Sequence, residues 1–139
     1  MTVKLIKIQN NKIIHNKKGN ILKFLNSKSK QFKGFGELYF SEIKKNTSKG
    51  WNIHYKYFSI ITVPYGLVEF TFFNPKKKNK KFQKITVGGK KNISIQIPPG
   101  IWFCFKSKKK ISVVANLLNK IHNKKETDKA AIINGKRIK

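Results

Sequence analysis

Short runs in which apolar and polar residues alternate recur along most of the chain, whereas the apolar spacing of a long helix is nearly absent. A period of two places every second side chain on the same face, so each run predicts a half-buried strand. We expect strands at 2–8 (an edge strand), 19–25, 36–43, 51–63 (bending from one strand into the next), 66–73, 82–87, 93–97, 101–106 and 111–118.

Turn-forming residues separate several of these runs, at 64–66 (Pro-Tyr-Gly), 88–89 (Gly-Gly) and 98–100 (Pro-Pro-Gly). Many short strands at near-regular spacing are typical of a β-sandwich or barrel. A short helical tail is expected only around 126–133, and the basic residues 134–139 are expected to be disordered. The pattern therefore predicts a single all-β domain over 1–133, with no internal repeat and no linker.

The composition supports a folded domain and excludes several classes of protein. The chain has 139 residues, of which 39% are hydrophobic and 12% aromatic, enough apolar material for a buried core. Cys104 is the only cysteine, which excludes an intramolecular disulfide and a zinc site built from several thiolates. No apolar run approaches the roughly 18 residues of a transmembrane helix, and no signal-peptide core is present. We therefore expect a soluble cytoplasmic protein with no membrane partner.

The charge is strongly basic, with 32 Lys and Arg against 5 Asp and Glu, a net charge of +27. Clustered cations favour nucleic-acid binding, but Arg137 is the only arginine, and base readers favour the arginine fork. Lys, Asn and Ile share A/T-rich codons, so compositional drift explains much of the charge. The lysine clusters at 76–81 and 106–110 then belong to solvated hairpin loops. We expect a surface that tolerates polyanions and no specific nucleic-acid partner.

Residues able to perform acid–base chemistry are few. His15 and His122 lie in polar stretches and are expected to be peripheral. His54 lies in the most aromatic part of the chain, where it is either a satisfied core histidine or a base in a dry pocket. The positions two residues away hold Asn52 and Lys56, so the paired histidines of a metal site on one strand face are missing. We expect no metal and no cofactor.

Three elements resemble the dTDP-4-dehydrorhamnose 3,5-epimerase family of cupins (RmlC-like), over roughly residues 34–123. They are Lys-Gly-Trp at 49–51 followed by His54, the Val-Pro-x-Gly turn at 63–66, and the segment IPPGIWFCF at 97–105. The resemblance implies a cupin-type jelly-roll β-barrel. It also implies a homodimer, in which the N-terminal strands are often exchanged between subunits.

The resemblance further implies an epimerase that inverts C3, C5 or both of a nucleotide-diphospho-4-keto-6-deoxyhexose. The family's His base falls on His54, and Lys49 falls on the basic residue that faces the enolate or the phosphate. Tyr39 is expected to line the sugar and, as Tyr55 or Tyr57 also could, to return the proton. The remaining substrate contacts are expected from Trp51, Lys56, Trp102 and Asn116.

The chain departs from the family pattern at three places. The family's catalytic Tyr should fall near Leu118 or Asn119, where no Tyr occurs, and Phe103 and Cys104 replace its second His. The segment that supplies an Asp partner for the base is truncated, so Glu69 is expected to orient His54 instead. Nucleotide-sugar 3,4-ketoisomerases of the same superfamily fit the length, although they usually carry paired His where this chain has Asn52 and His54. A non-catalytic cupin that binds a sugar or a polyanion is the third alternative.

Overall fold

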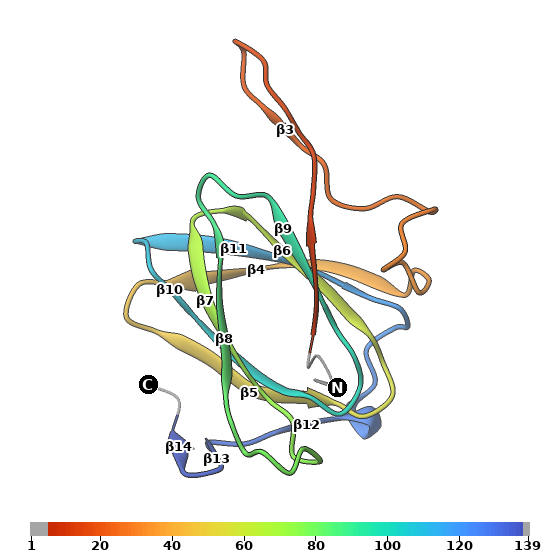
Figure 1. The fold of residues 1–139 in the computed structure, drawn as a ribbon, viewed down its shortest axis with the longest axis vertical. Coiled ribbons are helices and arrows are strands. Elements are labelled where there is room, and N and C mark those ends of the chain that lie inside the picture. The colour runs from red at the N-terminus through yellow and green to blue at the C-terminus, as the bar shows by residue number, and fades with distance from the viewer. Residues whose placement is uncertain (1–5, 138–139) are drawn as a thin grey trace.

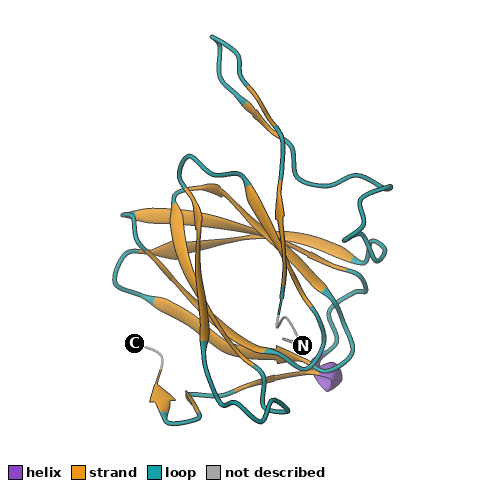
Figure 2. Ribbon diagram, in the orientation of Figure 1, coloured by secondary structure: helices purple, strands orange, loops and turns teal. Residues whose placement is uncertain are grey.

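Strands make up almost all the regular structure in residues 6–137, the part of the chain that the computed structural model describes (Figure 2). The all-β prediction is therefore confirmed. The strands are β1 (Lys7–Asn10), β2 (Ile13–Ile14), β3 (Ile21–Leu22), β4 (Glu37–Lys44), β5 (Ser48–His54), β6 (Ser59–Tyr65), β7 (Leu67–Phe73), β8 (Gln83–Gly88), β9 (Ile93–Ile97), β10 (Trp102–Ser107), β11 (Ile111–Leu118), β12 (Thr127–Lys129), β13 (Ile132–Ile133) and β14 (Lys136–Arg137).

Within residues 6–137, two five-stranded antiparallel sheets face each other across the interior of a barrel (Figure 1). The first sheet has the order β1-β9-β6-β11-β4, and the second has the order β12-β5-β10-β7-β8. From β4 to β11 the chain crosses between the two sheets at every connection except β7–β8, which is a hairpin within the second sheet. Such crossings are typical of a jelly roll. Strands distant in sequence, such as β5 and β10, are thereby brought side by side.

The main core fills the space between the sheets. On β7, the alternation buries Val68, Phe70 and Phe72 completely, and they pack with apolar side chains of both sheets. Removing each of these side chains from water contributes about 1.5–3 kcal/mol to folding. A second, smaller cluster covers the outer face of the second sheet. It contains Trp51, Phe73, Cys104, Phe82, Trp102, Ala130 and Ile133.

One glycine allows β5 to approach β10 closely. Gly50 has a φ of +110°, and a Cβ at this position would lie 2.7 Å from the carbonyl oxygen of Phe103 and 2.8 Å from Cα of Cys104. Both the left-handed backbone and the lack of space require glycine here. The segment that carries Lys49 and His54 is thus held against its neighbouring strand.

The expected C-terminal helix is wrong. Residues Lys124–Glu126 form a single 3-10 turn, and β12 then pairs antiparallel with β5, Thr127 opposite His54. The unpaired edge of β5 offers backbone hydrogen bonds that outweigh the weak local helix preference of this polar segment. Residues 134–137, expected as a disordered tail, contain β14, which pairs with β13, while residues 138–139 lie outside the described residues.

The strand expected at 2–8 overlaps β1, Lys7–Asn10, and residues 1–5 lie outside the described part. β1 pairs with β9 of its own chain, Ile8 opposite Ile95. The run 19–25 forms only β3, which pairs with β2 in a hairpin that projects beyond the barrel (Figure 1). Among residues 6–137 no helix has the length and hydropathy needed to cross a bilayer.

Candidate functional site

A hollow of about 220 Å³ opens between the two sheets of the barrel. Its floor is apolar, and its walls carry polar and ionisable side chains from both sheets. Apolar residues next to a few convergent polar groups are the usual composition of a small-molecule site. The hollow is lined by Tyr39, Ser41, Lys49, Asn52, His54, Ile61, Phe70, Phe103, Phe105, Val114, Asn116, His122, Thr127 and Lys129.

His54 ends β5 and is only 8% exposed. Its Nδ1 contacts Oε1 of Glu126, which is itself 4% exposed. The second carboxylate oxygen of Glu126 accepts from the backbone N–H groups of Lys56 and Tyr57, each at 3.3 Å. The ring of Tyr57 stacks on the imidazole at a centroid distance of 6.3 Å. These contacts fix both the plane of the imidazole and the carboxylate that holds it.

The Glu126 contact determines what His54 can do chemically. An ionised carboxylate only accepts hydrogen bonds, so the proton of a neutral His54 lies on Nδ1. The lone pair is then on Nε2, the nitrogen that is not engaged with Glu126. A neutral imidazole held in this tautomer can act as a general base.

The opposite wall of the hollow is formed by the first sheet. Asn116, on β11, is 5% exposed and donates from Nδ2 to the Tyr39 hydroxyl at 3.0 Å. The Oδ1 of Asn116 is buried with no hydrogen-bond partner among the described residues. Burial, followed by the charge of Glu37, raises the pKa of Tyr39 above its ordinary value. Tyr39 therefore stays protonated, and its O–H remains available to donate.

Cationic groups lie at the same site. Lys49, on β5, donates from Nζ to the Ser41 hydroxyl on β4 at 2.7 Å, which connects the two sheets. Lys129, on β12, also lines the hollow. An ammonium group next to a partly enclosed apolar floor can stabilise an oxyanion or a phosphate.

The structure brings four of the predicted site residues together: His54, Lys49, Tyr39 and Asn116. It does not bring the other four to this hollow. Glu69 lies on the outer face of the second sheet, between Lys84, Lys106 and Lys108, so it does not orient His54. Burial raises the pKa of its carboxyl, but the three ammonium groups outweigh that effect and lower it overall.

The two tryptophans and Lys56 also lie elsewhere. Trp51 is fully buried in the small outer cluster, and its ring N–H donates to the carbonyl of Lys136 at 3.1 Å. Trp102 packs against the same cluster. Lys56 is exposed, and only its backbone N–H meets the site, through Glu126.

Sequence reasoning missed three residues of the site. Glu126 was placed in a helix, where the pattern gives no reason for it to meet His54. His122 was expected to be peripheral, yet it lines the hollow, and its backbone N–H donates to Glu37 at 3.4 Å. Lys129 arrives with the unpredicted strand β12. One signal in the sequence could have identified Glu126. It is a carboxylate in the segment after β11, and the family resemblance implies that a later segment supplies an Asp partner for the base.

No group of three or more His, Cys, Asp or Glu side chains gathers in residues 6–137 in a way that could hold a metal ion. His54 has Glu126 on one nitrogen, and the other polar groups that line the hollow are amides, hydroxyls, amines and the imidazole of His122. The residues present fit acid–base chemistry carried out by side chains.

No family model matches the sequence, and no curated protein sequence matches it. Solved structures match over most of the chain. A dTDP sugar isomerase from Desulfovibrio desulfuricans G20 is 26% identical, with a TM-score of 0.85 over 90% of this chain and 83% of its own. The 3,5-epimerase RmlC from Legionella pneumophila Philadelphia 1, in complex with dTDP-4-keto-L-rhamnose, is 14% identical, with a TM-score of 0.83 over 96% and 77%.

A third similar structure is a variant of the 3,4-ketoisomerase QdtA from Thermoanaerobacterium thermosaccharolyticum, in complex with TDP-4-keto-6-deoxyglucose. It is 16% identical, with a TM-score of 0.78 over 91% of this chain and 88% of its own. The three comparisons agree on the architecture, and they confirm the resemblance that the segments 49–54, 63–66 and 97–105 indicated. In its structure, the chain is similar to the RmlC-like cupins.

Proposed function

We propose that the chain is an isomerase of nucleotide-diphospho-4-keto-6-deoxyhexoses that inverts C3, C5 or both. One observation carries the proposal: His54 and Tyr39 line the same hollow from opposite sheets. A hexose ring bound between the sheets would present one face to the imidazole and the other to the phenol. Inversion of a carbon needs a base on one face and an acid on the other.

The chemistry starts from the acidity of the carbon next to the C4 carbonyl. Nε2 of His54 takes the proton from C3 or C5, and the electron pair moves onto the carbonyl oxygen as an enolate. The ammonium of Lys49 would stabilise that oxygen. The Tyr39 hydroxyl then donates its proton to the opposite face of the carbon, and the carbonyl forms again. Solvent afterwards reprotonates Tyr39 and takes the proton from His54.

The size of the hollow supports a sugar ring as its occupant. Its volume of about 220 Å³ is smaller than the roughly 300–1,000 Å³ of sites that enclose larger ligands. The nucleotide would therefore lie outside the hollow, with its diphosphate near Lys49 and Lys129. The unpartnered Oδ1 of Asn116 would accept a hydrogen bond from a sugar hydroxyl.

A 3,4-ketoisomerase is the second candidate. Two observations favour it: the chain matches QdtA over 88% of the QdtA length, and a second histidine, His122, lines the hollow beside His54. In that reaction the proton removed from C3 is delivered to C4, while the O3 proton is transferred to O4. The carbonyl thereby moves from C4 to C3, C4 gains a hydrogen and a hydroxyl, and C5 is not inverted.

Incubation with TDP-4-keto-6-deoxyglucose in deuterated water, followed by NMR, distinguishes these functions. An epimerase places deuterium at C3, C5 or both and inverts the labelled carbon. A ketoisomerase yields the 3-keto sugar. Unchanged substrate without deuterium would show that the chain is not a catalyst of this class.

Three variants assign the roles of the residues. His54→Asn should reduce both deuterium exchange and inversion by about 10²–10⁴-fold. Tyr39→Phe should retain exchange on the His54 face but lose most of the inversion, because the proton can then return only from the side it left. His15→Asn, at an exposed histidine outside the hollow, is the matched control and should leave both rates unchanged. Exchange at the wild-type rate in His54→Asn would show that His54 is structural.

A further inference from the structure

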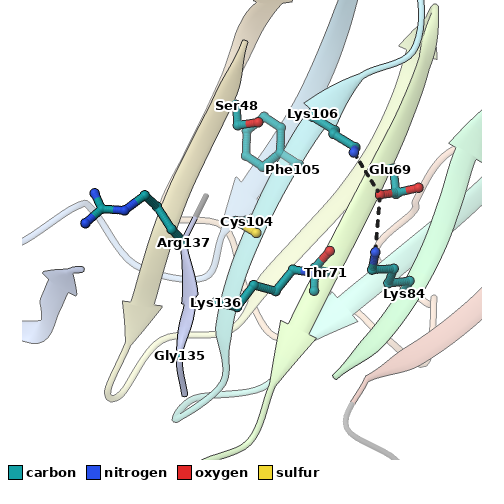
Figure 3. A pocket seen from close by; sticks show the side chains of 10 residues that line it. All are labelled: Ser48, Glu69, Thr71, Lys84, Cys104, Phe105, Lys106, Gly135, Lys136 and Arg137. Carbon is teal, nitrogen blue, oxygen red and sulfur yellow. Dashed lines mark ion pairs between the residues drawn. The ribbon is translucent and has the colours of Figure 1, made fainter. Parts of the chain in front are cut away.

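A second hollow, of about 430 Å³, lies on the outer face of the second sheet, beneath the C-terminal hairpin (Figure 3). The alternation along β7 and β10 turns Thr71 and Cys104 to this outer face, while Phe70 and Phe103 point into the barrel. The sheet itself therefore separates this hollow from His54. It is lined by Ser48, Glu69, Thr71, Lys84, Cys104, Phe105, Lys106, Gly135, Lys136 and Arg137.

The charges around this outer hollow are unbalanced. The Glu69 carboxylate lies 3.9 Å from the Lys84 ammonium, 3.6 Å from that of Lys106 and 3.5 Å from that of Lys108. Lys136 adds a fourth cation, whose Nζ lies 5.4 Å from the centre of the Phe82 ring and points toward Thr71 in Figure 3. Three ammonium groups thus share the Glu69 carboxylate. The contact of Lys136 with the Phe82 ring does not neutralise its charge.

The other side-chain carboxylates of residues 6–137 lie elsewhere. Glu126 is engaged with His54, Asp128 accepts from the Tyr55 hydroxyl, and Glu37 accepts from the backbone of His122. Glu42 lies on β4, in the other sheet. Among residues 6–137, Glu69 is thus the one side-chain carboxylate at the outer hollow, and its lysines leave an excess of positive charge that would attract an anion from solution.

We propose that the outer hollow binds a diphosphate group, held by the ammonium groups of Lys84, Lys106 and Lys136 with the Thr71 hydroxyl on its floor. The lysines that pair with Glu69 are about half exposed, and such pairs stabilise a fold by only about 0–1 kcal/mol each. An incoming phosphate can therefore compete for these ammonium groups at little cost.

An adjoining hollow favours a diphosphate over a single phosphate. It has a volume of about 340 Å³ and shares Ser48 and Lys106 with the outer hollow. Lys45 and Lys108 also line it. The lysines therefore extend over two adjoining hollows that meet at Lys106, and two linked phosphates could contact the lysines of both hollows at once.

Calorimetric titration with inorganic pyrophosphate and with inorganic phosphate, at a salt concentration near 0.15 M, tests the proposal. Wild-type protein should bind pyrophosphate at least about tenfold more tightly than phosphate. The double variant Lys106→Gln/Lys136→Gln should bind pyrophosphate at least about tenfold more weakly. The control Lys17→Gln/Lys18→Gln removes two charges from an exposed turn outside the hollow and should change the affinity less than twofold.

Amide NMR shifts locate the bound pyrophosphate. The largest changes should fall on Thr71, Cys104, Lys106 and Gly135. Changes concentrated on Asn52, Ile61 and Asn116 would place the anion in the barrel hollow and overturn the proposal. Equal weakening in both double variants would also overturn it, since overall charge would then explain the binding. Neither result tests the proton transfers of sugar isomerisation, which the deuterium experiment measures separately.

Discussion

Glu126 sets the chemistry of His54 at the scale of a single residue, because its carboxylate can only accept a hydrogen bond. In Glu126→Gln, the amide oxygen would still accept from the backbone N–H groups of Lys56 and Tyr57. The amide nitrogen would then face Nδ1 of His54 and move the imidazole proton to Nε2. The base would be blocked while the packing is preserved, so deuterium exchange should fall by about 10²–10⁴-fold.

The matched control is Glu42→Gln, at an exposed carboxylate on β4, which should keep the wild-type exchange rate. Circular dichroism and the melting temperature should be close to wild type in Glu42→Gln and only modestly lowered in Glu126→Gln. If Glu126→Gln exchanged deuterium as fast as wild type, the tautomer of His54 would not limit the reaction.

Cys104 provides a second residue-scale test. Burial raises the pKa of its thiol to about 11, against the smaller opposing effects of a hydrogen bond with Thr71 and nearby lysines. At pH 8 only about one thiol in 10³ is then ionised, and the thiolate is the reactive form. Iodoacetamide should therefore alkylate the native protein at least about 10²-fold more slowly than the unfolded protein, and the rate should rise tenfold per pH unit up to about pH 10.

Because Cys104 is the only cysteine, a single mass increase in the mass spectrum reports on it alone. Denatured protein is the control and should react completely. Equally fast alkylation of the native chain at pH 8 would contradict the burial of this thiol.

The sequence predicted the residues whose position follows from strand alternation or from the family resemblance. His54, Lys49, Tyr39 and Asn116 are in this group. Glu69 was expected at the site, although the β7 pattern alternates it with Val68, Phe70 and Phe72 and so indicates the face opposite the core. In the structure these three apolar side chains fill the core and Glu69 points outward. Burying the apolar side chains is favourable, whereas burying an unpaired carboxylate would cost free energy.

At the scale of the element, β5 depends on Gly50. Gly50→Ala places a methyl group within 3 Å of the β10 backbone and forces a left-handed φ on alanine. We expect a loss of about 2–4 kcal/mol in the free energy of unfolding. Gly100→Ala is the control, because Gly100 also has a positive φ, +85°, but a Cβ there meets nothing within 4 Å.

Urea denaturation of the two variants separates strain from overlap. Gly100→Ala should lose about 1 kcal/mol, the cost of the backbone conformation alone. The difference between the two variants measures the close approach of β5 to β10. Equal losses of unfolding free energy in the two variants would show that β5 and β10 can move apart to accommodate the methyl group at no cost.

The strands from β4 to β11 were predictable because most of them alternate apolar and polar side chains, even where both faces are buried, as on β9. The C-terminal elements were not, because β12 and β14 are too short and too polar to show a period. β12 forms by pairing with the edge of β5, Asp128 opposite Ile53. That pairing is a property of the folded barrel, and it also delivers Glu126 to His54.

At the scale of the whole molecule, the two hollows differ in the role that a carboxylate plays in each. In the barrel, Glu126 contacts His54 and supports acid–base chemistry. On the outer face, Glu69 pairs with three lysines, which leaves an excess of positive charge. Because carboxylates are so few, most of the lysine ammonium groups face solvent. Salt at 0.15 M screens the interactions between such exposed charges beyond about 8 Å. Selective binding of anions then depends on hollows where several ammonium groups converge.

The homodimer expected from the family resemblance is the last prediction. The β2–β3 hairpin projects from the barrel, and its residues Ile21 and Leu22 are 54% and 43% exposed (Figure 1). A two-stranded hairpin without packing is only marginally stable in water. On β4, Leu38 and Phe40 are also 46% and 66% exposed. We expect a second copy of the chain to cover these apolar surfaces.

Light scattering after size-exclusion chromatography at micromolar concentration should give twice the 16.1 kDa of one chain. Ile21→Asp/Leu22→Asp removes the apolar side chains of the hairpin and should shift the protein toward the monomer. Lys17→Gln/Lys18→Gln lowers the charge by the same amount in the same hairpin and should leave the dimer intact. A wild-type monomer at this concentration would contradict the dimer. If only the Asp variant is monomeric, the projecting hairpin is held by the apolar surface of the second chain.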